Sequence, residues 1–261
     1  MKTLRLLLAA GLLVAGLFQA IRAEETEKPV VQFKNKSIEE SLTIDSKLQA
    51  YPKLYAKLVA AGKHELAKWA ADAEEERKTN PDEFAGDRRW YIERGYSVRS
   101  IIGRYVSIVF GDDTYGGGAH PNHYLDTLLW DAQADKFINI SPFFKETRPG
   151  GPTLKALAKS IRAALAVAKK AKDFEVKDPE TDFELAAVKP KLTALGGIAL
   201  APSTEKDRSS GFSVYFSPYA VGSYAEGPYT VFVPWTTFKA YLSPAGAKLF
   251  AGERPASDKD E

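Results

Sequence analysis

The sequence predicts an α+β fold in which an antiparallel sheet meander carries two long helices packed on one face. Two observations lead to this class. Apolar and polar residues alternate with a period of two over 90–140, whereas apolar residues recur every three or four positions over 53–79 and 153–172. The strands come in runs and do not alternate strictly with the helices, so we expect one antiparallel sheet instead of parallel βαβ units.

The first predicted elements are a short strand over 38–44 and an amphipathic helix over 53–79. Pro52 stands at a favourable helix start, and Asn80-Pro81 ends the periodic pattern. The helix has one apolar stripe, formed by Tyr55, Leu58, Val59, Gly62, Leu66, Trp69, Ala70 and Ala73. His64 falls about 200° around the helix from Gly62, so it is expected on the solvent side without a functional role.

The meander over 90–140 has breaks at Gly103, 111–121 and 131–136. The second helix, over 153–172, has an apolar stripe formed by Leu154, Leu157, Ala158, Ile161, Leu165 and Ala168. It also has a basic stripe, expected to be a solvated face, formed by Lys155, Lys159, Arg162 and Lys169.

Three further strands are predicted after the second helix, over 195–200, 212–216 and 229–233. Ser243-Pro244 is typical of a helix start, so a last short helix is expected to end near Gly252.

The first 23 residues are typical of a secretory signal peptide. Lys2 and Arg5 precede an apolar run over 6–18, and Ala23 precedes two acidic residues. Cleavage after Ala23 would lower the basic residues from 36 to 33 and leave the 34 acidic residues, so the net charge would change from +2 to −1. We therefore expect a periplasmic or secreted protein, and no nucleic-acid partner, because the basic excess belongs to the signal.

The domain organisation follows from the length and composition. Removing 23 of 261 residues leaves 238, enough for a single domain over 24–251, with a polar, disordered tail over 252–261. No stretch beyond the signal approaches the ~20 apolar residues that a membrane span needs, so no span is expected. The chain has no cysteine, which excludes a disulfide framework and a lipid-anchoring cysteine.

The most informative stretch, over 112–124, reads Asp-Asp-Thr-Tyr-Gly-Gly-Gly-Ala-His-Pro-Asn-His-Tyr. Consecutive glycines allow a backbone with positive φ, and they place two of the three histidines on a loop. We predict a ligand-binding surface on this loop, joined by a tyrosine from a later aromatic run. Its residues are Tyr115, Gly116, Gly117, Gly118, His120, Asn122, His123, Tyr124 and Tyr224.

Tyrosine suits recognition because it offers a flat apolar face and a polar tip for contact with a sugar or a protein. Tyr115 and Tyr224 are expected to be exposed. Tyr219 is expected to be structural, because Pro218-Tyr219 breaks a strand.

Catalytic and metal sites have weaker support in the sequence. The two loop histidines could bind a metal with a nearby aspartate, but they lack a helical frame and a third spaced ligand, so we expect no metal and no cofactor. There is no cysteine and no Gly-x-Ser-x-Gly turn. Asp112 and Asp113 would point to opposite faces of a strand and could not serve one site together. A glycosidase pair that includes Glu226 stays open, but the chain is predicted not to be an enzyme.

The order of these motifs resembles the PdaC/RsiV-like extracellular domain family. The resemblance rests on a Tyr-x-Gly-Gly-Ala-His-x-Asn core, here over 115–122 with the extra Gly116, on Ser-Pro-Phe-Phe over 141–144, and on the run over 212–235. It covers roughly 30–242. Members are the sensor part of lysozyme-responsive anti-sigma factors, modules beside peptidoglycan deacetylases, or stand-alone secreted proteins.

The resemblance implies a non-catalytic binding protein of the cell envelope that recognises peptidoglycan or a muramidase such as lysozyme. Two alternatives remain. One is a hydrolase or metal-dependent enzyme that acts on cell-wall glycan through His120 and nearby acids. The other is a structural envelope protein that interacts with a partner.

Overall fold

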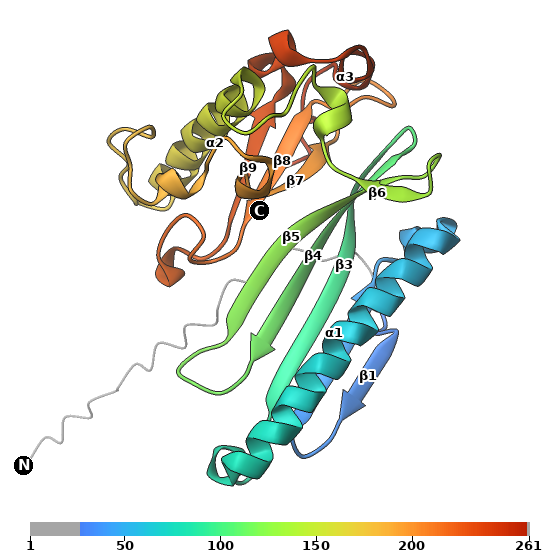
Figure 1. Ribbon diagram of the computed structural model, residues 1–261, viewed down its shortest axis with the longest axis vertical. Coiled ribbons are helices and arrows are strands. Elements are labelled where there is room, and N and C mark those ends of the chain that lie inside the picture. Colours follow the sequence, from blue (N-terminus) through green and yellow to red (C-terminus); the bar gives the residue numbers. More distant parts are fainter. Residues whose placement is uncertain (1–26, 260–261) are drawn as a thin grey trace, which may run out of the picture.

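The computed structural model describes residues 27–259, so the predicted signal peptide and its cleavage site lie outside the described residues. The chain forms a six-stranded sheet in the order β1-β2-β3-β4-β5-β6 and a three-stranded sheet in the order β7-β8-β9 (Figure 1). The α+β class predicted from the two periodicities is confirmed. The region over 27–259 contains no helix long and apolar enough to cross a membrane.

The six-stranded sheet includes the predicted meander. Its strands are β1 (Val31–Lys34), β2 (Ile38–Ile44), β3 (Trp90–Ile102), β4 (Tyr105–Tyr115), β5 (Asn122–Asp131) and β6 (Lys136–Ile138). All neighbours are antiparallel except β2 and β3, which run parallel because the long helix α1 (Pro52–Thr79) carries the chain back between them. The expectation of a purely antiparallel sheet is therefore wrong at this pair.

Helix α1 covers one face of the six-stranded sheet, as Figure 1 shows. Leu58 and Leu66 are buried at the predicted spacing, and His64 is exposed as predicted. A Cβ atom at Gly62 would lie 2.6 Å from Leu42 Cδ1, so glycine allows the helix to approach β2 closely. Trp130 of β5 is 1% exposed and belongs to the same core.

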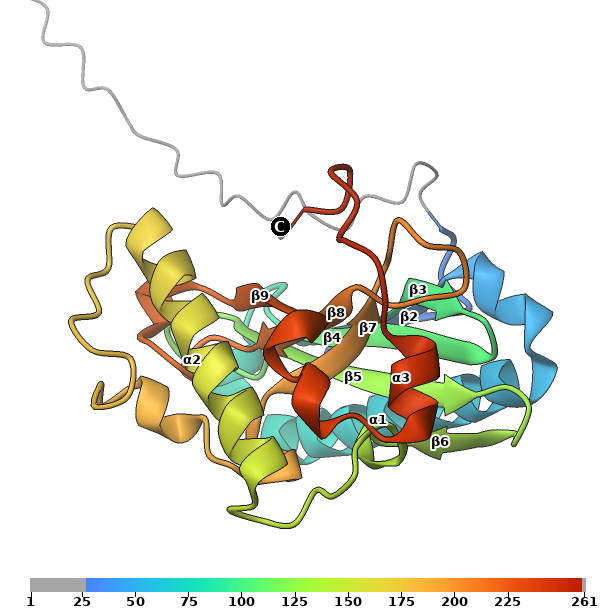
Figure 2. The same cartoon turned by 90° about the horizontal axis from the view of Figure 1, so that it is seen from above.

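The second sheet has its own helix. It consists of β7 (Gly197–Ala201), β8 (Gly211–Phe216) and β9 (Tyr229–Pro234), and α2 (Pro152–Ala171) packs against β9 (Figure 2). The expectation that both long helices share one sheet is wrong. Apolar periodicity identifies the buried side of a helix, but it does not identify the surface that covers that side.

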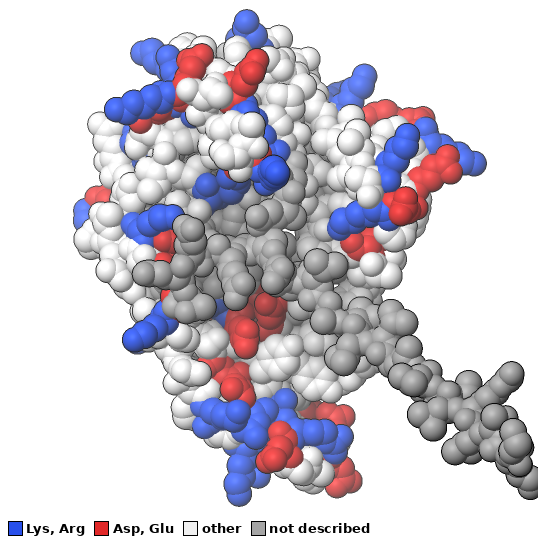
Figure 3. Space-filling model, turned by 180° about the vertical axis from the view of Figure 1, so that it is seen from behind, with Lys and Arg blue, Asp and Glu red and all other residues white. Residues whose placement is uncertain are grey.

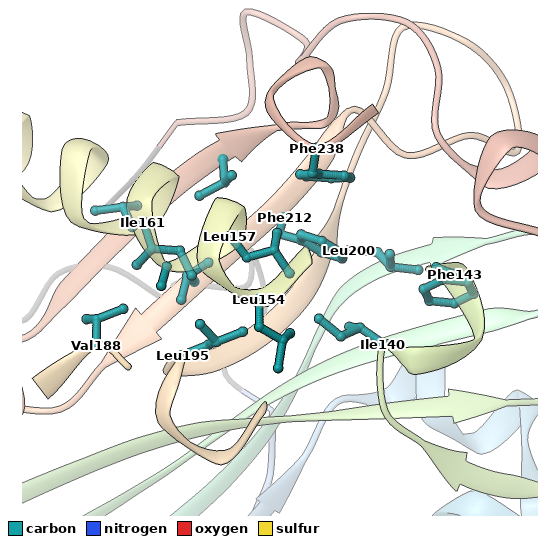
Figure 4. Packing of buried hydrophobic residues seen from close by; sticks show 14 of the residues in the cluster. Ile140, Phe143, Leu154, Leu157, Ile161, Val188, Leu195, Leu200, Phe212 and Phe238 are labelled. Atoms are coloured by element: carbon teal, nitrogen blue, oxygen red, sulfur yellow. The ribbon is translucent and has the colours of Figure 1, made fainter. Parts of the chain in front are cut away.

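A cluster of phenylalanines closes the core of the second sheet. The ring centroid of Phe212 lies 4.9 Å from that of Phe238 and 5.2 Å from that of Phe250. Figure 4 shows Phe212 and Phe238 beside Leu157 of α2. The short helix α3 (Pro244–Leu249) begins as predicted, and its Ser243 hydroxyl accepts a hydrogen bond from the Gly246 amide at 3.1 Å.

The open edge of β7 lies against the face of the six-stranded sheet, where hydroxyl side chains satisfy its backbone. The Ser100 hydroxyl donates to the Leu200 carbonyl at 2.7 Å, and the Leu200 amide donates to the Ser107 hydroxyl at 3.1 Å. The Thr127 hydroxyl donates to the Ile198 carbonyl at 2.9 Å. Because these side chains replace a neighbouring strand, the second sheet needs no further strand on this edge.

The C-terminal segment does not behave as the predicted tail over 252–261. The Asp258 carboxylate pairs with Arg99 of β3 at 2.7 Å and with Arg254 at 2.6 Å, and the Trp235 indole donates to the Gly252 carbonyl at 3.0 Å. Burial alone would raise the pKa of Asp258, but the hydrogen bonds from both arginines outweigh it and lower the pKa. The expectation of disorder is wrong over 252–259, because a polar segment can also be held by partly buried ion pairs.

Candidate functional site

The glycine loop, residues 116–121, connects β4 to β5 at the end of the long hairpin. Gly117 and Gly118 have φ angles of +83° and +92°, which confirms the predicted left-handed backbone. The Tyr115 hydroxyl donates to the Gly118 carbonyl at 3.2 Å and closes the loop on itself. A Cβ atom at Gly116 would lie 3.3 Å from the ring of Trp69, so α1 supports the start of the loop.

Replacing Gly118 by alanine is expected to cost about 1–2 kcal/mol of stability, because a left-handed residue with a Cβ atom is strained. No atom lies within 4 Å of the position that the new Cβ atom would occupy, so the loss would come from the backbone alone. Gly95→Ala is the matched control, since its Cβ position is also open and its φ is not positive. Thermal melting of the two variants makes the comparison. Equal melting temperatures would contradict the backbone explanation.

The connection between β8 and β9, residues 217–228, lies against the glycine loop. The Tyr224 hydroxyl donates to the Pro121 carbonyl at 2.7 Å. The Tyr224 ring stacks on the His120 ring with a centroid distance of 4.1 Å and an interplanar angle of 27°. The Tyr219 ring follows, 5.3 Å from that of Tyr224. The structure thus brings two predicted site residues, His120 and Tyr224, together from different sheets. Tyr115 and Tyr224 are half-buried, which is less accessible than the exposed positions expected for them.

A histidine and an acid lie beside this stack. His123 of β5 is opposite Asp113 of β4, and its Nδ1 is hydrogen-bonded to the Asp113 carboxylate. The Tyr224 ring centroid is 6.4 Å from that of His123. On the neighbouring strand pair, the rings of Tyr91 and Tyr115 stack at 6.1 Å. We call this face the His–Tyr surface; it consists of Tyr91, Asp113, Tyr115, His120, His123, Tyr219 and Tyr224.

Partial burial and neighbouring acids shape the electrostatics of the His–Tyr surface. Burial raises the pKa of Tyr91, and the charge of Asp113 raises it further. Burial also raises the pKa of Glu93, which is opposite Asp113 in the sheet, and the charges of Asp113 and Glu39 add to this effect. The surface therefore combines aromatic rings with carboxylates.

Tyr124 does not belong with the other predicted site residues. It follows His123 in a strand, so its side chain lies on the opposite face, where its hydroxyl donates to Asp126 at 3.1 Å. Burial and the neighbouring Asp126 raise the pKa of Tyr124 to about 12. Asp112 also lies on that face, where it binds the guanidinium of Arg94 through both carboxylate oxygens. The adjacent acids thus have separate partners, as strand alternation predicts.

The expectation that Tyr219 is a structural residue is wrong. Its side chain is 63% exposed, and its φ of +69° turns the ring outward beside Tyr224. Pro218 does end the strand, but the left-handed turn that follows is not visible in the sequence. The sequence prediction omits Tyr91, because only the pairing of β3 with β4 places it on this surface; the same pairing places Glu93 opposite Asp113. Asn122 is exposed at the start of β5, and its carbonyl accepts from Thr114 at 3.4 Å.

Glu226 is a buried structural carboxylate and does not lie on the His–Tyr surface. It is 7% exposed, it pairs with Lys169 of α2, and it accepts hydrogen bonds from the Tyr229 hydroxyl and the Ser223 amide, both at 2.7 Å. Burial would raise the pKa of Glu226, but these hydrogen bonds outweigh it and lower the pKa to about 2. A carboxyl that stays ionised cannot act as a general acid near neutral pH.

Lys169 contradicts the expectation that the basic stripe of the second helix is solvated. It is 1% exposed, and it lies one helical turn after the buried Leu165. Arg162 of the same stripe is also engaged, since two of its nitrogens bind the Glu180 carboxylate at 3.2 and 2.6 Å. Lys155 and Lys159 are exposed as expected.

Among residues 27–259, no group of three or more histidine, cysteine, aspartate or glutamate side chains is arranged to hold a metal ion. This arrangement does not test metal binding itself, so the absence of a metal stays a prediction.

Part of the chain is similar to a known family model. Residues 143–236 match a family model described as a protein of unknown function, DUF3298. This segment contains α2, all three strands of the second sheet and the connection that carries Tyr224. A search of curated proteins gives no match.

Two solved structures of DUF3298 family proteins have a similar fold. One, from Bacteroides fragilis, is 16% identical, with a TM-score of 0.52 and coverage of 82% of this chain and 92% of that chain. The other, from Pseudomonas aeruginosa, is 14% identical, with a TM-score of 0.53 and coverage of 85% and 91%. At these identities the similarity concerns the fold.

Proposed function

We propose that the protein is a non-catalytic binding protein of the cell envelope and that the His–Tyr surface is its recognition surface. The observation that carries the proposal is the stack of Tyr224 on His120, at 4.1 Å. Tyr224 and Pro121 are 103 residues apart in the chain, and the two segments that contain them meet here through aromatic rings. Tyr219 extends the stack into solvent. Exposed aromatic faces with polar tips suit contact with sugar rings or with a protein surface.

The proposed ligand is peptidoglycan or a muramidase such as lysozyme. The support comes from the resemblance of the core over 115–122 and of the run over 212–235 to the PdaC/RsiV-like family. A periplasmic or secreted location belongs to the same proposal. On the face in Figure 3, basic side chains are interspersed with acidic ones, so this face offers no continuous basic field for a nucleic acid.

One observation favours an enzyme as the second candidate. The Asp113 carboxylate holds Nδ1 of His123, which is how an acid orients an imidazole that acts as a general base. His120 has a different partner, since its Nδ1 lies 2.7 Å from the Pro121 carbonyl oxygen. The hydrolase alternative therefore moves from His120 to His123. Acting on cell-wall glycan, it would release soluble fragments.

Tyr224→Ala is expected to weaken binding by about 2 kcal/mol or more, because it removes the centre of the aromatic stack. The measurement is retention of the purified protein on insoluble peptidoglycan and on immobilised lysozyme. Tyr124→Ala is the matched control, since Tyr124 is 47% exposed on the opposite face of the same hairpin. It is expected to bind like the unchanged protein.

The reverse pattern, with binding lost in Tyr124→Ala and kept in Tyr224→Ala, would place the site on the other face of the hairpin. If the unchanged protein released soluble fragments from peptidoglycan and His123→Ala did not, the enzyme candidate would replace the binding proposal. If neither probe retained the unchanged protein, the structural alternative would gain support.

A further inference from the structure

Residues 217–228, which we call the Tyr224 arm, have an exposed aromatic end and a buried charged base. Tyr219 is exposed and Tyr224 is half-buried, whereas Glu226 is almost fully buried. Only one residue separates Tyr224 from Glu226. If the Glu226 carboxylate moved, the Tyr224 ring that stacks on His120 would therefore move with it.

Glu226 fixes the shape of the arm. Its Oε1 accepts from the Ser223 amide at 2.7 Å and from the Ser223 hydroxyl at 3.1 Å, while Ser223 caps the turn over 224–226. A Cβ atom at Gly222 would lie 2.5 Å from Oε2 of Glu226, so the chain wraps closely around the carboxylate. The other oxygen, Oε2, also accepts from the Tyr229 hydroxyl at 2.7 Å.

Two lysines at the C-terminal end of α2 hold the base of the arm: Lys169 in the last turn and Lys172, which caps the helix. Lys169 donates to the Glu226 carboxylate and, at 2.7 Å, to Glu184. Lys172 donates to the backbone carbonyls of Glu226 and Pro228, both at 2.8 Å. The side chains of Lys169 and Glu226 are 2% and 4% exposed, so little water competes for this ion pair.

We infer that Lys169 is a positioning residue of the recognition surface, because through Glu226 it holds the Tyr224 ring against His120. The inference rests on the proposed function only for the statement that this surface binds a ligand. Helix α2 supplies the Lys169 cation, and the Glu226 carboxylate that it binds shapes the turn over 224–226. This turn places the Tyr224 ring on the glycine loop, which belongs to the other sheet. A small displacement at the base would therefore separate the stacked rings.

The test uses the histidine side chains as reporters in NMR spectra. The chain has three histidines, and His64 lies exposed on α1, which makes it an internal reference. Because the Tyr224 ring centroid lies 4.1 Å from that of His120, its ring current is expected to shift the ring-proton resonances of His120. Tyr224→Ala defines the positions of these resonances without the stack.

Two variants address the ion pair. Lys169→Met removes the cation and keeps a long side chain. The double variant Lys169→Met with Glu226→Gln removes both charges. Its amide oxygen can still accept from Ser223 and its amide nitrogen can donate to the Tyr229 hydroxyl, so the fold can persist even if the single variant unfolds. Lys170→Met, at the next and exposed position, is the control.

We expect the His120 resonances of both Lys169 variants to move toward those of Tyr224→Ala, with His64 and the Lys170→Met spectrum unchanged. If the folded double variant kept the His120 resonances of the unchanged protein, the inference would be wrong. Retention on peptidoglycan and on immobilised lysozyme is then measured for the same variants, with about tenfold weaker binding expected. Shifted resonances without binding by any protein would contradict the proposed function and leave the positioning role intact.

Discussion

Lys169→Met alone is expected to lower the free energy of unfolding by about 3–5 kcal/mol, because it leaves the Glu226 carboxylate buried without its cation. Urea denaturation at neutral pH measures this loss. Lys170→Met, one position away and exposed, should change the free energy of unfolding by no more than about 0.5 kcal/mol.

The double variant Lys169→Met with Glu226→Gln should recover most of the lost stability, because no unpaired charge is then buried. An equal loss in the single and double variants would show that the unpaired carboxylate is not the cause. The cause would then be the packing of the lysine side chain beneath the ring of Tyr229, 5.4 Å from its ammonium group.

The same pair predicts a dependence of stability on pH. The pKa of Glu226 falls from 4.5 to about 2 on folding, so its contribution is complete above pH 4.5 and is lost as the pH falls toward 2. Burial lowers the pKa of Lys169, but hydrogen bonds to Glu184 and Glu226 outweigh it and raise the pKa above 10.5. Its contribution is therefore present below pH 10.5 and lost at higher pH. Stability measured against pH for the unchanged protein and for Lys169→Met should therefore converge as the pH falls from 4.5 toward 2, because protonation of Glu226 removes the ion pair from the first and the unpaired charge from the second.

Phe212→Ala should cost about 3–5 kcal/mol, the second large effect, because it opens a cavity at the centre of the phenylalanine cluster. Phe212 is 1% exposed, and the rings of Phe238 and Phe250 lie within 5.2 Å of it. The measurement is again urea denaturation.

Phe183→Ala removes the same atoms from a side chain that is 92% exposed, so its stability should change by no more than about 0.5 kcal/mol. Equal losses in the two phenylalanine variants would contradict the assignment of Phe212 to the core. A smaller loss in Phe212→Leu, which fills part of the cavity, would support it.

The elements themselves follow closely from local patterns. The strand over 38–44 has the predicted bounds, and α1 begins at Pro52, one residue before the prediction. The pairing of elements was not predictable in the same way. The parallel pair β2–β3 and the separate sheet under α2 depend on contacts between distant segments, which the period of a helix or strand does not specify.

Two errors in the predicted positions of side chains could have been avoided from the sequence. His123 and Tyr124 are adjacent in a strand, so the alternation that separates Asp112 from Asp113 also separates them. Lys169 lies one turn after Leu165, on the side that the apolar stripe marks as buried. Tyr219 and Tyr91 are different, because a left-handed turn and a strand register place them.

The contact of β7 with the larger sheet has a consequence for the order in which the two sheets can form. The strands β1 to β6 precede the second sheet in the chain, so they can pair before β7 is in place. Until then, the hydroxyls of Ser100 and Ser107 face water, and Arg99 lacks Asp258, which follows 159 residues later. Because hydroxyl and guanidinium groups bond well to water, these side chains have partners at this contact even before β7 and Asp258 arrive.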